Sequence, residues 1–223
     1  MKKILAIALC LCMVLCAVAC GGTKEADYKL GLGVVVSTAS SKEGNAQVDA
    51  TIAAVVTDAE GKIVSCRIDV AQNKMAIADG AVDTAKTFET KMELGSRYGM
   101  AGIVDNNGDG VMKEWNEQAN AFEAYVVGKT AAEVEAIKTQ TVNNHQIAVD
   151  EALLKAGCTI AITDFIKAVD NAFKSAHKVS FKSAATLTLG VSAIGTVANN
   201  EDNQGNTILN SLSYATDFAA TVF

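Results

Sequence analysis

The pattern of apolar and polar residues divides the chain into strands, then helices, then strands again. Five segments have the apolar, β-branched character of strands: residues 29–36, 46–57, 62–70, 186–197 and 207–223. A Gly-containing turn at residues 58–61 joins the second and third segments, and apolar residues alternate from Val64 onward. This combination predicts an antiparallel hairpin.

In the middle of the chain the apolar spacing becomes helical, with apolar side chains three and four residues apart. The helices expected from this spacing are residues 88–98, 114–127, 149–155 and 163–176, with a further short helix from Thr130. Thr130 and Glu133 have the form of a capping box, and Thr163 is predicted to cap the last helix. We interpret as core packing the aromatic residues of the second helix, Trp115, Phe122 and Tyr125.

This order of elements predicts an α+β fold, with an antiparallel sheet and helices packed on one side of it. We expect residues 29–223 to form a single domain. The segment at residues 29–34 resembles the segment at residues 187–191, and each is followed by a polar loop and a long strand. A duplicated β-hairpin at residues 187–223 and the convergence of two hairpins both explain this similarity.

The first 19 residues have the form of an export signal. Lys2 and Lys3 precede an apolar stretch that is too short to span a membrane comfortably, and small residues then lead to Cys20. The pattern resembles a bacterial lipoprotein signal, in which the cysteine becomes the N-terminus and carries lipid. The resemblance implies a signal peptide at residues 1–19, a lipidated tether at residues 20–28 and a location on the extracytoplasmic face of the cell membrane. An ordinary secretory leader is the alternative.

The balance of charged residues restricts the kinds of partner that we expect for this protein. Two of the 19 Lys and Arg residues lie in the leader, which leaves 17 basic residues against 25 acidic ones and a net charge of −8. This balance argues against nucleic acid and against electrostatic docking on anionic lipid, because both reward clustered basic residues. We therefore expect the membrane to be contacted through the lipid anchor alone.

Residues 157–163 read Gly-Cys-Thr-Ile-Ala-Ile-Thr and precede the last helix. With the hairpin around residues 58–63, this run resembles the FMN-binding domain of bacterial lipoproteins and respiratory flavoproteins, in which a Ser-Gly-Ala-Thr-x-Thr type motif precedes a helix. The resemblance covers residues 30–177. It implies that Gly157, Cys158 and Thr159 lie near the phosphate of FMN, with Thr163 orienting the start of the helix. A helix N-terminus suits a phosphate because it offers free N–H groups and a positive dipole end. The alternative is that residues 157–163 are a buried strand that leads into a capped helix.

The same resemblance implies flavin binding and electron transfer near the membrane, with an unknown redox partner. Ala161 stands where the family has the Thr that can carry FMN through a phosphoester bond, so the hydroxyl needed for covalent attachment is missing. The competing hypothesis is a non-catalytic surface lipoprotein that keeps the fold without the cofactor. No hydrolase motif is present, and we expect a binding protein rather than an enzyme.

Two further groups of residues are candidates for chemistry. Asp105, Asn107 and Asp109 occupy the first, third and fifth positions of an EF-hand-like loop, which predicts a weak calcium site, although Asn116 replaces the Glu of the twelfth position. A polar surface turn is the alternative. Cys66 and Cys158 remain after the leader and Cys20 are set aside, either as one disulfide or as two buried thiols.

Overall fold

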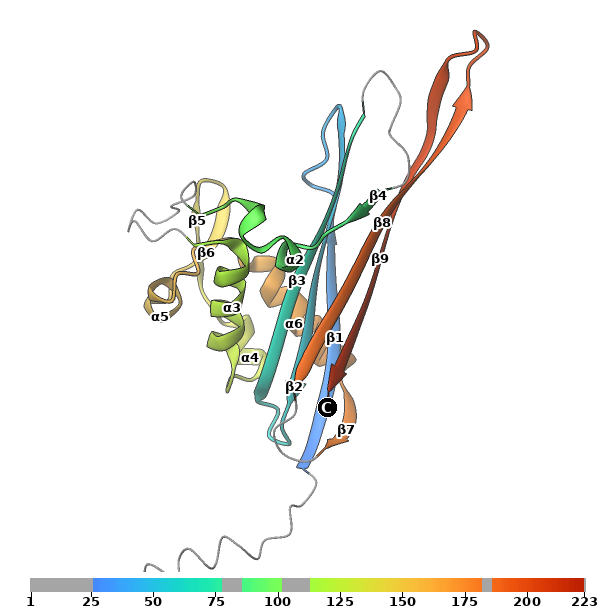
Figure 1. Cartoon of the computed structure of the whole chain (residues 1–223). Helices are drawn as coiled ribbons and strands as arrows, with labels where there is room; N and C mark the ends of the chain where they lie inside the picture. The colour runs from blue at the N-terminus through green and yellow to red at the C-terminus, as the bar shows by residue number, and fades with distance from the viewer. Residues whose placement is uncertain (1–25, 78–85, 102–112, 182–185, 223) are drawn as a thin grey trace, which may run out of the picture.

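The computed structural model describes residues 26–77, 86–101, 113–181 and 186–222, and its strands pair in three antiparallel sheets (Figure 1). The largest sheet has the order β3-β2-β1-β7, with β1 at Ala26–Ser37, β2 at Asn45–Thr57, β3 at Ile63–Ala76 and β7 at His177–Phe181. The second has the order β4-β8-β9, with β4 at Lys86–Phe88, β8 at Leu187–Glu201 and β9 at Thr207–Val222. A small hairpin pairs β5 (Thr139–Val142) with β6 (His145–Ala148).

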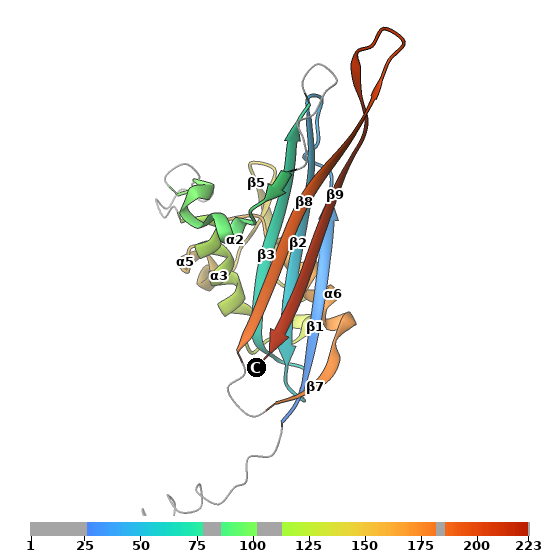
Figure 2. The same cartoon turned by 45° about the vertical axis from the view of Figure 1, so that its right-hand side comes forward.

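Helices and the second sheet cover opposite faces of the four-stranded sheet (Figures 1 and 2). The helical segments are α2 (Lys91–Leu94), the 3-10 turn η1 (Gly95–Tyr98), α3 (Trp115–Val126), α4 (Ala131–Glu135), α5 (Glu151–Lys155) and α6 (Thr163–Ser175). The predicted α+β fold with an antiparallel sheet and helices on one side is confirmed. The ribbon formed by β8 and β9 adds a third layer on the other side.

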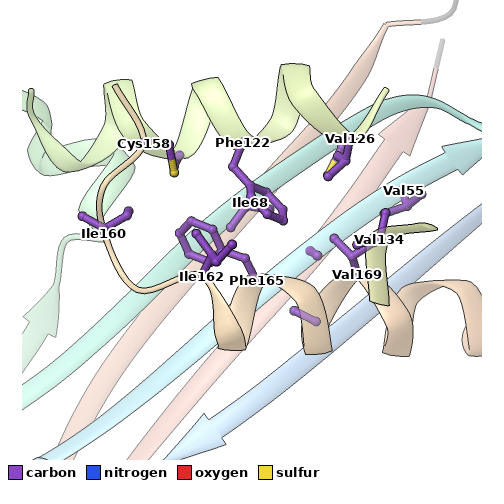
Figure 3. Packing of buried hydrophobic residues seen from close by; sticks show 14 of the residues in the cluster. Val55, Ile68, Phe122, Val126, Val134, Cys158, Ile160, Ile162, Phe165 and Val169 are labelled. Atoms are coloured by element: carbon purple, nitrogen blue, oxygen red, sulfur yellow. The ribbon is translucent and has the colours of Figure 1, made fainter. Parts of the chain in front are cut away.

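The central strand β2 is apolar on both faces because both faces are covered. Ala53 and Val55 pack toward the helices, whereas Ile52 and Ala54 pack toward the β8–β9 ribbon. This explains a nearly continuous apolar run where a half-exposed strand would alternate. On the helical side, Phe122 of α3 lies 5.4 Å from Phe165 of α6 between ring centroids, in an edge-on contact at the centre of the cluster shown in Figure 3.

Two glycines let α6 lie directly on the backbone of β1. A Cβ at Gly31 would lie 1.9 Å from the carbonyl oxygen of Ala172, and a Cβ at Gly33 would lie 2.0 Å from that of Ala168. No side chain fits at such distances, so strand and helix touch backbone to backbone. The helix side of this contact is built from small residues for the same reason.

The structure differs from the sequence-based expectations at several elements. Phe88, expected on a helix, ends strand β4, because it pairs with Ala193 and packs edge-on against Tyr214. The short strands β5, β6 and β7 were not predicted. The β2–β3 hairpin, the helix at residues 114–127 and the capping box at Thr130 are confirmed. Residues 187–222 form an antiparallel hairpin, but its origin by duplication stays a prediction.

The glycine contact generates a first prediction. Gly33→Ala forces a Cβ against the α6 backbone, which cannot retreat without losing its packing, so we expect the free energy of unfolding to fall by about 3 kcal/mol. Urea unfolding followed by circular dichroism measures the loss. Gly190→Ala is the matched control, because a Cβ there meets nothing within 4 Å, and we expect a change within about 0.5 kcal/mol. Equal losses in the two variants would contradict the close-approach explanation.

Candidate functional site

The segment predicted to hold a phosphate lies between α5 and α6, and its backbone amides are already bonded within the protein. Gly157, with φ +86°, donates its N–H to the carbonyl of Leu154, and Cys158 donates to the carbonyl of Leu153. The N–H groups of Thr159 and Ile160 both donate to one side-chain oxygen, Oε1 of Gln118, at 2.8 and 3.1 Å. The sequence therefore brings the expected residues together, but their donors are occupied.

Gln118 of α3 fixes this segment from the opposite side. Its side chain is 1% exposed, and its Nε2 donates to the carbonyl of Lys113 at 2.9 Å while Oε1 also accepts from the Thr159 hydroxyl at 3.2 Å. Cys158 is fully buried, and Figure 3 shows its side chain in the apolar layer beside α3. Gly157, Cys158 and Thr159 in this conformation do not fit a phosphate. Gln118 was not predicted, since nothing in the neighbouring sequence indicates that this polar side chain is buried.

The predicted cap at Thr163 is wrong. Thr163 is the first residue of α6, and the N-cap position belongs to Ile162, which offers no side-chain hydrogen bond. Ile162 is fully buried in the core, and its N–H donates to the carbonyl of Gln146 at 3.1 Å. Core packing and the β6 backbone thus fix the start of α6 where a hydroxyl was expected to do so.

A cavity of about 350 Å³ lies directly beside this segment, with Ile160 and Ala161 in its wall. Trp115 and Tyr98 line it, and Nζ of Lys91 lies 5.5 and 4.9 Å from their ring centroids. An ammonium at such distances from aromatic faces is held by cation–π attraction. The exposed side of Ala161, the position of the missing hydroxyl, therefore opens on a space whose walls hold two aromatic rings, the Lys91 ammonium and the Asp49 carboxylate.

The walls come from elements that are far apart in the sequence. Lys91 is in α2, Tyr98 in η1 and Trp115 at the start of α3, while His145 of β6 completes the basic side of the lining. Trp115 is 3% exposed and packs edge-on against Phe165, so the interpretation as core packing holds and the same residue also forms a wall. Sequence reasoning had no signal for Lys91, Tyr98 or His145, because only the tertiary fold places them together.

A larger cleft of about 570 Å³ follows the outer edge of β3 between α3 and the ribbon. Its ionic groups bond to the strand itself: Glu123 accepts from the N–H of Ile68 at 2.6 Å and from Nη1 of Arg67 at 3.1 Å. Burial raises the pKa of Glu123, and the bonds from Ile68 and Arg67 oppose this rise. Because these groups stabilise the strand edge, we place the candidate site in the cavity beside Ala161.

Cys66 and Cys158 are free, buried thiols, which decides between the two states considered for them. Burial raises the pKa of both, that of Cys158 to about 12. A thiol with such a pKa is not a nucleophile at neutral pH. We therefore treat both as small apolar core residues.

Two predicted sites fall outside the described residues. They are Cys20 and the calcium candidates Asp105, Asn107 and Asp109, and both remain predictions. Within the described residues, no group of three or more His, Cys, Asp or Glu side chains is placed to hold a metal ion. In that same part of the chain, no helix has both the length and the apolar character needed to cross a bilayer.

Comparison with known proteins gives one partial similarity. No protein-family model matches the chain, and no solved structure matches it. A protein of Desulfitobacterium hafniense named chlorophenol reductase is 34% identical over 123 residues, which is 47% of this chain and 36% of that protein. The chain thus spans little more than a third of that relative, and an overlap of this extent does not assign the chain to a family.

The Gln118 contacts generate a second prediction. Gln118→Ala removes the buried oxygen that accepts from the N–H groups of Thr159 and Ile160, so we expect the free energy of unfolding to fall by about 2–4 kcal/mol. Urea unfolding measures the fall, and hydrogen exchange at these two amides should accelerate. Gln140→Ala on the exposed face of β5 is the control, with an expected change within about 0.5 kcal/mol. Unchanged exchange at Thr159 and Ile160 would show that Gln118 does not hold the segment.

Proposed function

We propose that this chain is a lipid-anchored extracytoplasmic domain that binds FMN without a covalent bond, in the cavity beside Ala161, and serves electron transfer near the membrane. The observation that carries the proposal is the lining of that cavity. Aromatic rings of Trp115 and Tyr98, with Lys91 between them, meet at the position that bears the flavin in the family resembled by the sequence.

The size and chemistry of the cavity suit the flavin ring. Ligand pockets range from about 300 to 1,000 Å³, so a volume of about 350 Å³ is enough for the planar ring system, with the rest of the ligand reaching outward. Trp115 and Tyr98 supply aromatic surface, which favours a planar partner. When bound, the flavin would supply one- and two-electron redox chemistry, and the protein would position the ring and tune it electrostatically.

The phosphate is assigned to different residues from those expected. The amides of residues 157–160 are bonded within the protein, and Lys91 and His145 are the basic side chains that line the cavity. The ammonium group of Lys91 can attract a phosphate as a point charge. We therefore assign phosphate binding to Lys91 and His145 and positioning of the nearby backbone to Gln118. The carboxylate of Asp49, which also lines the cavity, accepts from Nε2 of Gln47 through both oxygens.

The partial relative supports a redox role in general terms. Its name describes a reductase, and a domain that binds a flavin is a reasonable part of a redox system. Its substrate is not carried over to this chain. The cavity gives no basis for a substrate beyond the flavin itself.

A second candidate function is a non-catalytic surface lipoprotein that keeps the fold without a cofactor. Ala161 favours it, because covalent flavin attachment needs a hydroxyl there. The bonds from Thr159 and Ile160 to Gln118 favour it as well, because they remove two donors that a phosphate would otherwise use.

Titration of the purified protein with FMN separates the two candidates. We expect binding to quench flavin fluorescence, since Trp115 and Tyr98 border the ring, and Lys91→Gln to weaken binding about tenfold by removing one charge-assisted contact. Lys74→Gln is the matched control, because Lys74 is an exposed lysine of β3 that does not line the cavity. If the protein takes up no FMN, the flavin proposal fails and the second candidate stands.

The lipid anchor is tested separately at Cys20. Labelled palmitate should enter the wild-type protein and a Cys16→Ser variant, but not Cys20→Ser, because only the cysteine after the small-residue box is expected to be lipidated. Each buried methylene contributes about 0.8 kcal/mol, so loss of the acyl chains should also release the protein from the membrane fraction. Incorporation into Cys20→Ser at the wild-type level would contradict the assignment.

A further inference from the structure

The edges of the four-stranded sheet are protected by side chains. An uncovered edge strand exposes N–H and C=O groups that invite pairing with another chain, and proteins usually block such edges. At β3, three ionic residues bond to outward-facing backbone groups: Arg67 donates to the carbonyl of Cys66, Glu123 accepts from Ile68 and Asp69 accepts from Val70. These side chains therefore occupy backbone groups of β3 that a partner strand would otherwise pair with.

The opposite edge is closed by α6 and by a short strand. β7 pairs with β1 only as far as Leu30, and beyond that residue Ser175 of α6 bonds to the β1 backbone instead. Its Oγ accepts from the N–H of Leu32 at 3.0 Å and donates to the carbonyl of Leu32 at 2.6 Å, while Asn171 donates to the carbonyl of Val34 at 3.0 Å. β7 itself has five residues, too few to offer a long template.

The described residues of the edge strand β9 show no such side-chain contact with the strand's own backbone edge. β9 is 16 residues long and forms the outer strand of the β4-β8-β9 sheet. Asp217 is its one charged residue, no Lys or Arg occurs from Thr186 to the C-terminus, and the chain contains no proline. Among the hydrogen bonds of the described residues, none joins a charged side chain to the β9 backbone. The described residues of β9 thus show none of the side-chain contacts that block the edges of the four-stranded sheet, and β8, on the other side of the ribbon, is covered by β4 only at residues 193–195.

The position of β9 leaves both room and apolar surface for a partner strand. Leu212, Tyr214 and Phe218 pack against the core between the sheets but remain partly exposed. The turn end of the ribbon also extends beyond the β1–β2–β3 layer, so a strand added there does not collide with that layer (Figures 1 and 2). A further strand beside β9 would bury more of these side chains.

We propose that β9 pairs in antiparallel fashion with β9 of a second copy of this chain, so that two β4-β8-β9 sheets join edge to edge. A two-fold axis makes the same strand complementary to itself, which is the commonest form of homodimer. Residues 207–216 carry no charge, so this pairing brings no like charges together. The proposal is independent of flavin binding.

The experiment compares matched pairs of lysine substitutions in the full chain, purified in a mild detergent. Ser213→Lys with Ala215→Lys adds charge to the exposed face of β9, where like charges on paired strands repel. Thr188→Lys with Ser192→Lys adds the same charge to the exposed face of β8, the strand next to β9 that the proposed pairing does not use. Light scattering across a concentration series, corrected for bound detergent, gives the mass of the protein.

We expect the wild type and the β8 variant to be dimers and the β9 variant to dissociate at least tenfold more readily. Hydrogen exchange of the wild type adds a measurement that needs no variant: β9 amides should exchange more slowly as concentration rises. A wild type that is monomeric at every concentration overturns the proposal. So does a β9 variant that dimerises as the wild type does, or protection that grows with concentration on other strands but not on β9.

Discussion

The contact between α6 and β1 is the constraint on which the other features depend. Because Gly31 and Gly33 let the helix backbone rest on the strand, α6 is held at a fixed height above the sheet. This close packing places Ile162 and Phe165 in the core, and it therefore determines the path of residues 157–161 before the helix. Ala161 faces the cavity as a consequence of this packing. Ser175 and Asn171, on the same helix, close the strand edge that β7 leaves open.

The contacts of Gln118 show that a segment can resemble a phosphate-binding motif in sequence while its backbone donors are used within the protein. The run of residues 157–163 keeps the glycine and the first threonine of the resembled pattern, but its first two amides bond to backbone carbonyls and those of Thr159 and Ile160 bond to one buried side chain. A buried amide side chain with satisfied partners rigidifies its surroundings. The segment is therefore a well-fixed wall of the cavity, and the phosphate binding that we propose falls to side chains of the lining, Lys91 and His145.

Local patterns predicted the elements that local forces determine. The β2–β3 hairpin has its own turn, α3 has a regular apolar spacing, and the Thr130 capping box lies within four residues, so each could be read from the sequence. Phe88 was expected on a helix because of its local spacing. Its strand forms through pairing with β8, and this distant contact cannot be read from the neighbouring residues. Thr163 was expected as a cap because its hydroxyl is visible in the sequence, whereas the burial of Ile162 is not. The cavity lining could not be predicted, since it needs α2, η1, α3 and β6 together.

The proposed lipid anchor and the proposed β9 pairing constrain one another through the direction of the strands. β1 begins at the end of the sheet opposite the turn between β8 and β9 (Figure 1). A two-fold antiparallel dimer therefore sends its two N-termini in opposite directions along the strands. Five residues lie between Cys20 and Ala26, so the tether makes six residue-to-residue steps, and at about 3.5 Å per step it reaches no more than roughly 20 Å. Both anchors reach one membrane only when the strands lie along its surface, so an upright anchored chain and a β9-paired dimer exclude each other within a single membrane.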